Sequence, residues 1–359
     1  MPGMLEGITI VDFSRYLPGP YATLRLLERG AKVVKIEDKN GDPARHLGER
    51  DGRPGSLFCA ENIGKDCLSY DLKDDGDRKM VLRLLETADV VVESFRPGVV
   101  KRLGVDYETL RKINRGVIYV SVSGYGQQSF ISNLVGHDLN YLSMSGMMNE
   151  LKDAAGRPIN PGVALGDLFT SFAVSEAILA GICQRDRTHE GQYMDISMTD
   201  ALISCMGYLV THSSMSSGTD GTDVHGIGYG IFETGDGRYV SMCAMEPKFF
   251  ANFCRFANKE HLIEHQFTEA VPDNPYYMEI VRFFKSRTFA QWCDIYEDTD
   301  FCLAPVFTAG ELKDTRYARE RGLIESRWGM DYVTSLYTGE KGFLDKYDKP
   351  YGRLGEDND

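Results

Sequence analysis

The stretch that decides the fold is residues 7–37, "GITIVDFSRYLPGPYATLRLLERGAKVVKIE". Its first seven residues form an apolar, β-branched run that is typical of a buried strand. The next part begins near Pro18 and ends at Gly30, which predicts a helix, because proline fits the first turn of a helix and glycine follows the last. Residues 32–37 predict a second strand. A strand, a helix and a strand at this spacing indicate a parallel β-α-β unit.

The same alternation continues to about residue 126. An amphipathic helix is predicted at 76–88, strands at 89–95 and 116–126, and a short helix at 107–113. This pattern favours an α/β domain with an open, Rossmann-like parallel sheet. The glycine fingerprint GxGxxG is absent after the first strand, so we expect no NAD or FAD site. The ligand should still lie beyond the carboxyl ends of the strands.

The rest of the chain predicts a second, smaller domain. Residues 213–226 are rich in serine, glycine and threonine, as in a linker, and residues 228–245 predict a β-hairpin. We therefore expect a large α/β domain at 1–185, a linker at 186–224 and a small α+β domain at 225–305. The remaining residues, 306–359, are expected to return to the large domain and pack on it.

Composition narrows the classes of partner. The 359 residues carry a net charge of −13 with a pI near 5.1, which disfavours binding to nucleic acid or to an anionic membrane. Eight cysteines without a CxxC pair indicate reduced thiols. We see no signal peptide and no apolar run of about 18 residues that would span a membrane. These features predict a cytoplasmic location, with neither nucleic acid nor membrane as partner.

Titratable residues stand at the starts of two predicted helices. In residues 134–146, "LVGHDLNYLSMSG", His137 and Asp138 precede an apolar helical run, and Asp167 heads the longest predicted helix. The aspartates could be simple helix caps. Two helix N-termini could instead converge on one substrate, where their partial positive charge favours an oxyanion. Glu246, just before Pro247, is most simply a charge at a helix start.

Two further groups of residues could bind a ligand. Basic residues gather near predicted strand ends, which suggests either a phosphate pocket or a solvated charged rim, and composition alone does not decide between them. They include Lys35, Lys39, Lys65, Lys73, Arg96, Lys101 and Arg102. His261 and His265 have the i, i+4 spacing of metal ligands, but no third ligand is evident, so we expect structural histidines and no metal.

The order of several motifs resembles the superfamily of family III CoA-transferases and α-methylacyl-CoA racemases. The resemblance covers nearly the whole chain and rests on "PGPYA", "VVKIE", "DLK", "ESFRPGV", "VSGYG", "GHDLNYLSMSG", "GDLF", "GQYMDISM" and "EPKFF". The histidine of GHD-[IL]-NY and the EPKF segment mark the racemase branch, and both are present.

The resemblance implies specific roles. His137 and Asp167 would be paired catalytic bases, and Glu246 would orient His137. Coenzyme A would be part of the substrate, with no metal or other cofactor. The family is known for interlocked homodimers, in which each active site lies between one chain's large domain and the other's small domain. The implied substrate and CoA contacts are Lys39, Tyr70, Asp71, Leu72, Lys73, Ser94, Phe95, Arg96, Arg102, Gly136, Asp138, Leu139, Asn140 and Tyr141.

Three departures from the racemase pattern concern the site. Asp38 stands where racemases often carry a basic residue, so Lys39 or Arg45 would have to substitute for it. The segment 41–62 is longer than in typical racemases, and its "GDPAR" resembles the transferase branch. The glycine run that often follows the racemase aspartate is replaced by "LFTSF".

These observations predict a racemase or epimerase of 2-methylacyl-CoA thioesters. One base would remove the α-proton and the other would return a proton to the opposite face of an enolate. The alternative is CoA transfer between carboxylic acids, with Asp167 as a nucleophile that forms an aspartyl-CoA intermediate. A third hypothesis is a non-catalytic acyl-CoA binding protein, which the joint presence of His137, Asp167 and Glu246 disfavours.

Overall fold

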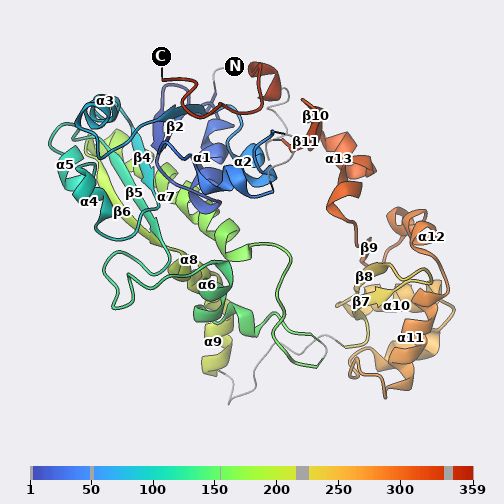
Figure 1. The fold of residues 1–359 in the computed structure, drawn as a ribbon. Coiled ribbons are helices and arrows are strands. Elements are labelled where there is room, and N and C mark those ends of the chain that lie inside the picture. Colours follow the sequence, from blue (N-terminus) through green and yellow to red (C-terminus); the bar gives the residue numbers. More distant parts are fainter. Residues whose placement is uncertain (1–2, 49–51, 154, 216–225, 335–342, 359) are drawn as a thin grey trace. The chain divides into compact units, whose positions relative to one another are not determined.

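The computed structural model describes residues 3–48, 52–153, 155–215, 226–334 and 343–358. The chain divides into two compact units, each described here by itself. The large unit comprises residues 1–215 and 321–359, and the small unit comprises residues 216–320. Figure 1 traces the chain through both units.

A six-stranded parallel sheet forms the centre of the large unit, in the order β3-β2-β1-β4-β5-β6. The order reverses between β1 and β4, which are neighbours, and such a switch point is where open α/β sheets bind ligands. The predicted α/β class and parallel sheet are confirmed. The strands are β1 (Thr9–Asp12), β2 (Lys32–Glu37), β3 (Asp66–Ser69), β4 (Val90–Glu93), β5 (Ile118–Ser123) and β6 (Gln192–Ser197).

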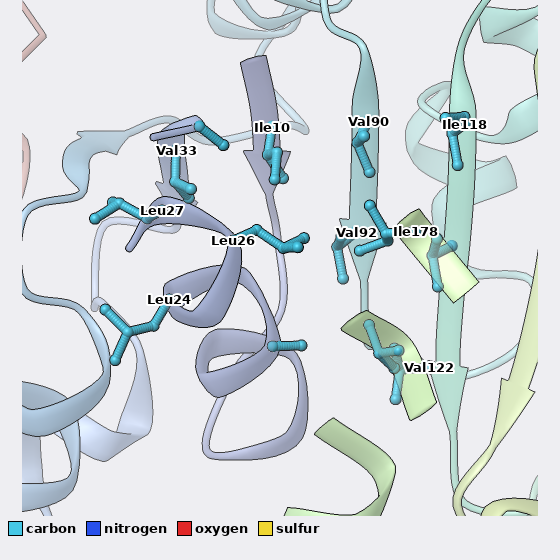
Figure 2. Packing of buried hydrophobic residues seen from close by; sticks show 14 of the residues in the cluster. Ile10, Leu24, Leu26, Leu27, Val33, Val90, Val92, Ile118, Val122 and Ile178 are labelled. Atoms are coloured by element: carbon cyan, nitrogen blue, oxygen red, sulfur yellow. The ribbon is translucent and has the colours of Figure 1, made fainter. Parts of the chain in front are cut away.

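Helices cover both faces of this sheet, and successive strand residues therefore enter two different cores. Ile10 and Val92 pack with α1 and α7 on one face, whereas Val11 and Val91 pack with α3 on the other. In Figure 2, Leu26 of α1 reaches toward Ile10 and Val92. The helices of this unit are α1 (Pro18–Leu27), α2 (Ser56–Glu61), α3 (Asp75–Leu85), α4 (Val99–Leu103), α5 (Tyr107–Leu110), α6 (Asp138–Met144), α7 (Leu165–Thr188), α8 (Met198–Cys205) and α9 (Gly207–Met215).

The end of the chain adds a β-hairpin and a tail to the large unit. Strands β10 (Ile324–Arg327) and β11 (Met330–Val333) pair antiparallel. The tail binds the edge strand β3, because Asp357 accepts a hydrogen bond from the Cys67 N–H and Asn358 bonds both backbone groups of Ser69. The tail therefore covers backbone groups of an edge strand that could otherwise pair with another chain.

The small unit is an α+β domain around an aromatic core. Its antiparallel sheet has the order β7 (Tyr229–Glu233), β8 (Tyr239–Cys243), β9 (Leu303–Pro305). Phe232, Phe253 and Phe284 stack in the core with centroid distances of 4.4 and 5.7 Å. Its helices are α10 (Pro247–Phe256), α11 (Pro275–Lys285), α12 (Phe289–Cys293) and α13 (Arg316–Arg321), the last of which ends at the boundary with the large unit.

The two histidines of the predicted i, i+4 pair lie in a 3₁₀ segment of the small unit, Glu260–His265, and contact different partners. His261 lies 3.2 Å from Glu279, and His265 stacks on Tyr276 with a centroid distance of 3.5 Å. No group of three possible metal ligands occurs among the described residues.

The boundaries differ from those predicted. Residues 186–215 are not a linker, because β6 lies within them and pairs with β5 along its whole length. The small unit also extends to Glu320, beyond the predicted end at residue 305. The Ser/Gly-rich residues 216–225 lie outside the described part of the chain.

Helix α7 is long and apolar enough to cross a membrane by length and composition alone, which the sequence reading did not anticipate. Core helices have the same properties. Val174 and Ile178 of α7 are fully buried and pack in the core of the large unit, and Ser175 donates to the Ala22 carbonyl of α1.

Candidate active site

The residues predicted to contact CoA follow the ends of neighbouring strands. Lys39 comes after β2, residues 70–73 after β3, residues 94–96 after β4, and residues 136–141 follow β5 in the chain. Because the strands are parallel, their carboxyl ends share one edge of the sheet. Helix α7 runs back along the sheet before β6, so its N-terminus, with Asp167, begins at the same edge. One edge therefore carries the predicted residues of the large unit.

Helices α6 and α7 are joined at their first residues. His137 is the N-cap of α6, and its N–H donates to the Asn140 side chain at 3.0 Å. The neighbouring Asp138 reaches across to α7, where its Oδ1 accepts the backbone N–H of Asp167 at 3.0 Å. The structure thus places side by side the two helix starts that carry His137 and Asp167, with Asp138 as the link between them.

This junction requires close approach of the two helix starts. A Cβ on Gly166 would lie 2.9 Å from Asp138 Oδ1, so a larger residue would displace the carboxylate. On the other side of α6, the Tyr141 hydroxyl donates to the Gly136 carbonyl at 2.6 Å and its ring packs edge-on against Tyr125. The segment that carries His137 is therefore held at both ends.

The environment of Asp167 suits proton transfer. Burial, together with the negative charge of Asp138, raises the pKa of Asp167 to about 7. A carboxyl group with this pKa exchanges its proton readily at neutral pH. The His137 side chain is exposed at the N-terminus of α6 and accessible to a substrate.

Four cations predicted to contact the ligand are exposed near the carboxyl edge of the sheet: Lys39, Lys73, Arg96 and Arg102. Lys39 pairs only loosely with Asp71, at 3.4 Å. Arg45, the other candidate to replace the basic residue missing at position 38, is buried and forms two bonds with Glu37, at 2.6 and 2.7 Å. Lys39 is therefore the better placed of the two to contact a phosphate.

Two other lysines of the predicted basic group do not face solvent. Lys35 lies 2.9 Å from Asp42, Lys65 lies 3.2 Å from Asp12, and all four side chains are fully buried. Their charges are compensated inside the fold, so the suggestion that they contribute to a phosphate pocket is wrong. The pairing partners are far apart in the sequence, which is why the pattern did not reveal them.

The residues after β3 mainly form the turn at the carboxyl edge of the sheet, and few of their side chains are free to contact a ligand. Leu72 is buried in the core, so only its backbone can meet a ligand. Tyr70 packs partly against the same core. Asp71 accepts the Lys73 N–H at 3.0 Å, and this bond lowers the Asp71 pKa. Asp71 thus forms the turn that presents Lys73.

Two residues at the switch point were missed by the sequence reading. Arg15, just after β1, pairs with Asp38 at 2.7 Å, and its N–H donates to Ser94 Oγ at 3.1 Å. It therefore connects the loops after β1, β2 and β4, and its position directly after a strand could have indicated it. Glu93, at the end of β4, is buried and accepts the Phe95 N–H at 2.7 Å, which holds the segment that carries Ser94 and Arg96. Burial raises the Glu93 pKa to about 7.

Glu246 belongs to the small unit. It is the N-cap residue of α10, follows β8, and is exposed. Its predicted role beside His137 stays a prediction.

Comparison with known proteins places these features in a family context. The model of CoA-transferase family III matches residues 5–334. Human α-methylacyl-CoA racemase is 29% identical over 328 residues, covering 89% of this chain and 81% of its own length. Mouse succinyl-CoA:glutarate CoA-transferase is 30% identical over 337 residues, covering 89% and 76%. The crystal structure of a CaiB/BaiF family protein from Brucella suis superposes with a TM-score of 0.84 at 25% identity, covering 99% of this chain and 97% of that one.

Proposed function

Because the chain belongs to CoA-transferase family III, whose members are enzymes, we propose that it racemises 2-methylacyl-CoA thioesters. The observation that carries the proposal is the link between His137 and Asp167 through Asp138. A thioester acidifies the neighbouring C–H bond only weakly, so inversion needs a base on one face of the carbon and an acid on the other. A histidine and a carboxyl group at adjacent helix starts can supply this pair.

The two bases exchange roles with the direction of the reaction. In one direction neutral His137 removes the α-proton and protonated Asp167 returns a proton to the opposite face. In the other direction ionised Asp167 removes it and the imidazolium of His137 returns it. The N-terminal N–H groups of the two helices favour the enolate oxygen that forms in between, and such donors are worth about 3 kcal/mol each.

Recognition of CoA is assigned to the exposed cations. Lys39, Lys73, Arg96 and Arg102 would bind the phosphates, and the backbone of residues 70–73 and 94–96 would line the ligand. No metal or further cofactor takes part in the proposed reaction. A cytoplasmic location and a homodimer belong to the same proposal.

CoA transfer is the second candidate, since the mouse relative is named as a CoA-transferase. There the Asp167 carboxylate attacks the thioester carbonyl and expels the CoA thiolate, which leaves an acyl-aspartyl anhydride. The thiolate then attacks the aspartyl carbonyl and releases the carboxylate of the first acid, forming an aspartyl-CoA thioester. Burial of Asp167 and the charge of Asp138 disfavour this route, because together they keep part of Asp167 protonated at neutral pH.

Proton exchange separates the two candidates. A 2-methylacyl-CoA incubated with the enzyme in deuterated water, without any acceptor acid, should gain one deuterium at C2. His137→Ala and Asp167→Asn should each lose at least about 100-fold of this exchange, as expected for a general acid–base residue, with CoA affinity unchanged within a few fold. Mass spectrometry of the recovered thioester measures the label.

A transferase would give a different pattern. Label would be absent, Asp167→Asn would abolish acid-dependent CoA exchange, and His137→Ala would change it little. Near-normal deuterium exchange by either variant would remove that residue from the racemase mechanism.

A further inference from the structure

A cavity of about 440 Å³ lies in the large unit between α1, α2 and β11. This volume is in the usual range of small-molecule sites. Leu24, Ile63 and Tyr332 supply apolar surface to its wall. Two polar residues of the same wall, Arg25 and Glu61, have no role in the catalytic pair or in the cation patch.

Arg25 has hydrogen-bonding capacity that the fold does not use. Its side chain is buried, one end of its guanidinium bonds Glu28, and it lies 4.8 Å from the centre of the Tyr21 ring. Its Nε and Nη1 atoms have no partner among the described residues. A buried donor without a partner costs roughly 1–3 kcal/mol, and more when it is charged. An acceptor in the cavity would offset this cost.

Glu61 is a second incompletely bonded group on the same wall. It is buried, and its Oε2 has no partner among the residues that the structure describes. Burial raises its pKa to about 9, and the charge of Asp167 contributes to this rise. Glu61 is therefore protonated at neutral pH and can donate a hydrogen bond. Tyr21, which also lines the cavity, packs edge-on against Phe172 of α7 with a centroid distance of 6.0 Å, so the cavity borders the helix that carries Asp167.

We propose that the cavity binds the far end of the acyl group and that this end is a carboxylate, so that the enzyme acts on the CoA thioesters of dicarboxylic acids. The inference rests on the proposed function. Arg25 Nε and Nη1 would donate to the carboxylate, and the Glu61 hydroxyl would donate to the same group. The apolar wall would pack against the methylene groups in between.

The charges near the cavity are compatible with an anion. Glu28 bonds Arg25 through a single nitrogen, Nη2, which leaves the other donors of the guanidinium for a second carboxylate. Glu61 adds no negative charge while it is protonated. Asp331, the other acid of the lining, is exposed, so solvent screens it.

The test compares the binding of matched thioesters. Equilibrium affinities are measured for pairs of equal chain length, namely succinyl- and butanoyl-CoA, and adipoyl- and hexanoyl-CoA. The wild-type enzyme should prefer the carboxylate member of at least one pair by about tenfold or more, as a charge-assisted hydrogen bond implies. Arg25→Lys keeps the charge opposite Glu28 but removes the fork of donors, and Glu61→Leu removes the hydroxyl. Each should reduce the preference to below about threefold and leave the affinity for the methyl-ended partner nearly unchanged.

Arg185→Lys is the matched control. Arg185 is also a largely buried arginine in an ion pair, with Asp89 at 2.6 Å, and it does not line this cavity. Its variant should keep the wild-type preference. Equal binding of both members at every length, or an unchanged preference in Arg25→Lys and Glu61→Leu, would overturn the inference. If Arg25→Lys fails to fold, Glu61→Leu still decides. Binding requires no turnover, so a carboxylate preference without any deuterium exchange would count against the proposed reaction alone.

Discussion

At the scale of single residues, Asp167 links the stability of the fold to the proposed function. Its pKa is raised from 3.8 to about 7. In the unfolded chain this proton is lost near pH 4, whereas the folded chain keeps it until about pH 7. Ionisation therefore removes stability from the folded state as the pH rises through this window. The carboxyl group that we propose as a catalytic base therefore lowers the stability of the fold at neutral and alkaline pH.

The first stability prediction follows from this cost. Asp167→Asn should abolish activity and yet raise the free energy of unfolding at pH 8 by about 1–3 kcal/mol, with no gain at pH 3. Urea unfolding at several pH values measures the difference. Asp153→Asn is the control, and its free energy of unfolding should fall at neutral pH. Hydrogen bonds from Arg157 lower the Asp153 pKa, so the charge of Asp153 stabilises the fold there. An Asp167→Asn protein that is less stable than wild type at pH 8 would contradict the prediction.

Burial raises the pKa of Asp167 most, and the charge of the neighbouring Asp138 raises it further. Asp138→Asn keeps an oxygen that can accept the Asp167 N–H but removes the negative charge. The Asp167 pKa should fall, and the limb of the pH–rate profile that reports Asp167 should move to lower pH. Asp138→Ala, which also loses the hydrogen bond, should lower kcat in addition. A profile that does not move in Asp138→Asn would mean that burial alone raises the pKa.

At the scale of elements, the sequence predicted most strands, because apolar β-branched runs such as residues 7–13 are typical of buried strands. It also predicted that the ligand lies at the carboxyl edge of the sheet, where the predicted contact residues of the large unit gather. The sequence did not reveal interactions between residues that lie far apart in the chain. Lys35 and Lys65 were grouped with a possible phosphate pocket or charged rim, because nothing near them in the sequence reveals their buried partners Asp42 and Asp12. Arg25 and Glu61 were missed for the same reason, since each is one polar residue in an ordinary helix.

The loops at the strand ends give a kinetic prediction. Arg102 on α4 is exposed, and a charge-assisted phosphate contact is worth about 1.5–3 kcal/mol, so Arg102→Ala should raise KM for acyl-CoA about tenfold or more. The contact is the same in ground and transition states, so kcat should change little. Lys112→Ala, an exposed cation outside the predicted contacts, is the control. A collapse of kcat at constant KM would show that CoA binds elsewhere.

At the scale of the whole molecule, the predicted catalytic residues are divided between the two units. His137 and Asp167 belong to the large unit and Glu246 to the small unit. The family resemblance implies that Glu246 of one chain serves His137 of another within an interlocked homodimer. We propose that the Glu246 carboxylate accepts the N–H of the far imidazole nitrogen, which fixes the tautomer and stabilises the imidazolium.

Substitution and co-expression test this proposal together. Glu246→Gln keeps the shape but removes the charge, so the histidine becomes a weaker base. We expect kcat to fall roughly 10- to 1000-fold and the acidic limb of the pH–rate profile to move lower. If the Glu246 charge only stabilises the start of α10, its removal should lower the free energy of unfolding by about 1 kcal/mol or less and leave kcat unchanged.

Co-expression of His137→Ala and Glu246→Gln chains shows whether each site lies within one chain or between two. If each site combines two chains, one of the two sites in a mixed dimer has both native residues, and activity returns. If each site lies within one chain, every site in the mixed dimer is defective, and the activity stays at the level of the single variants.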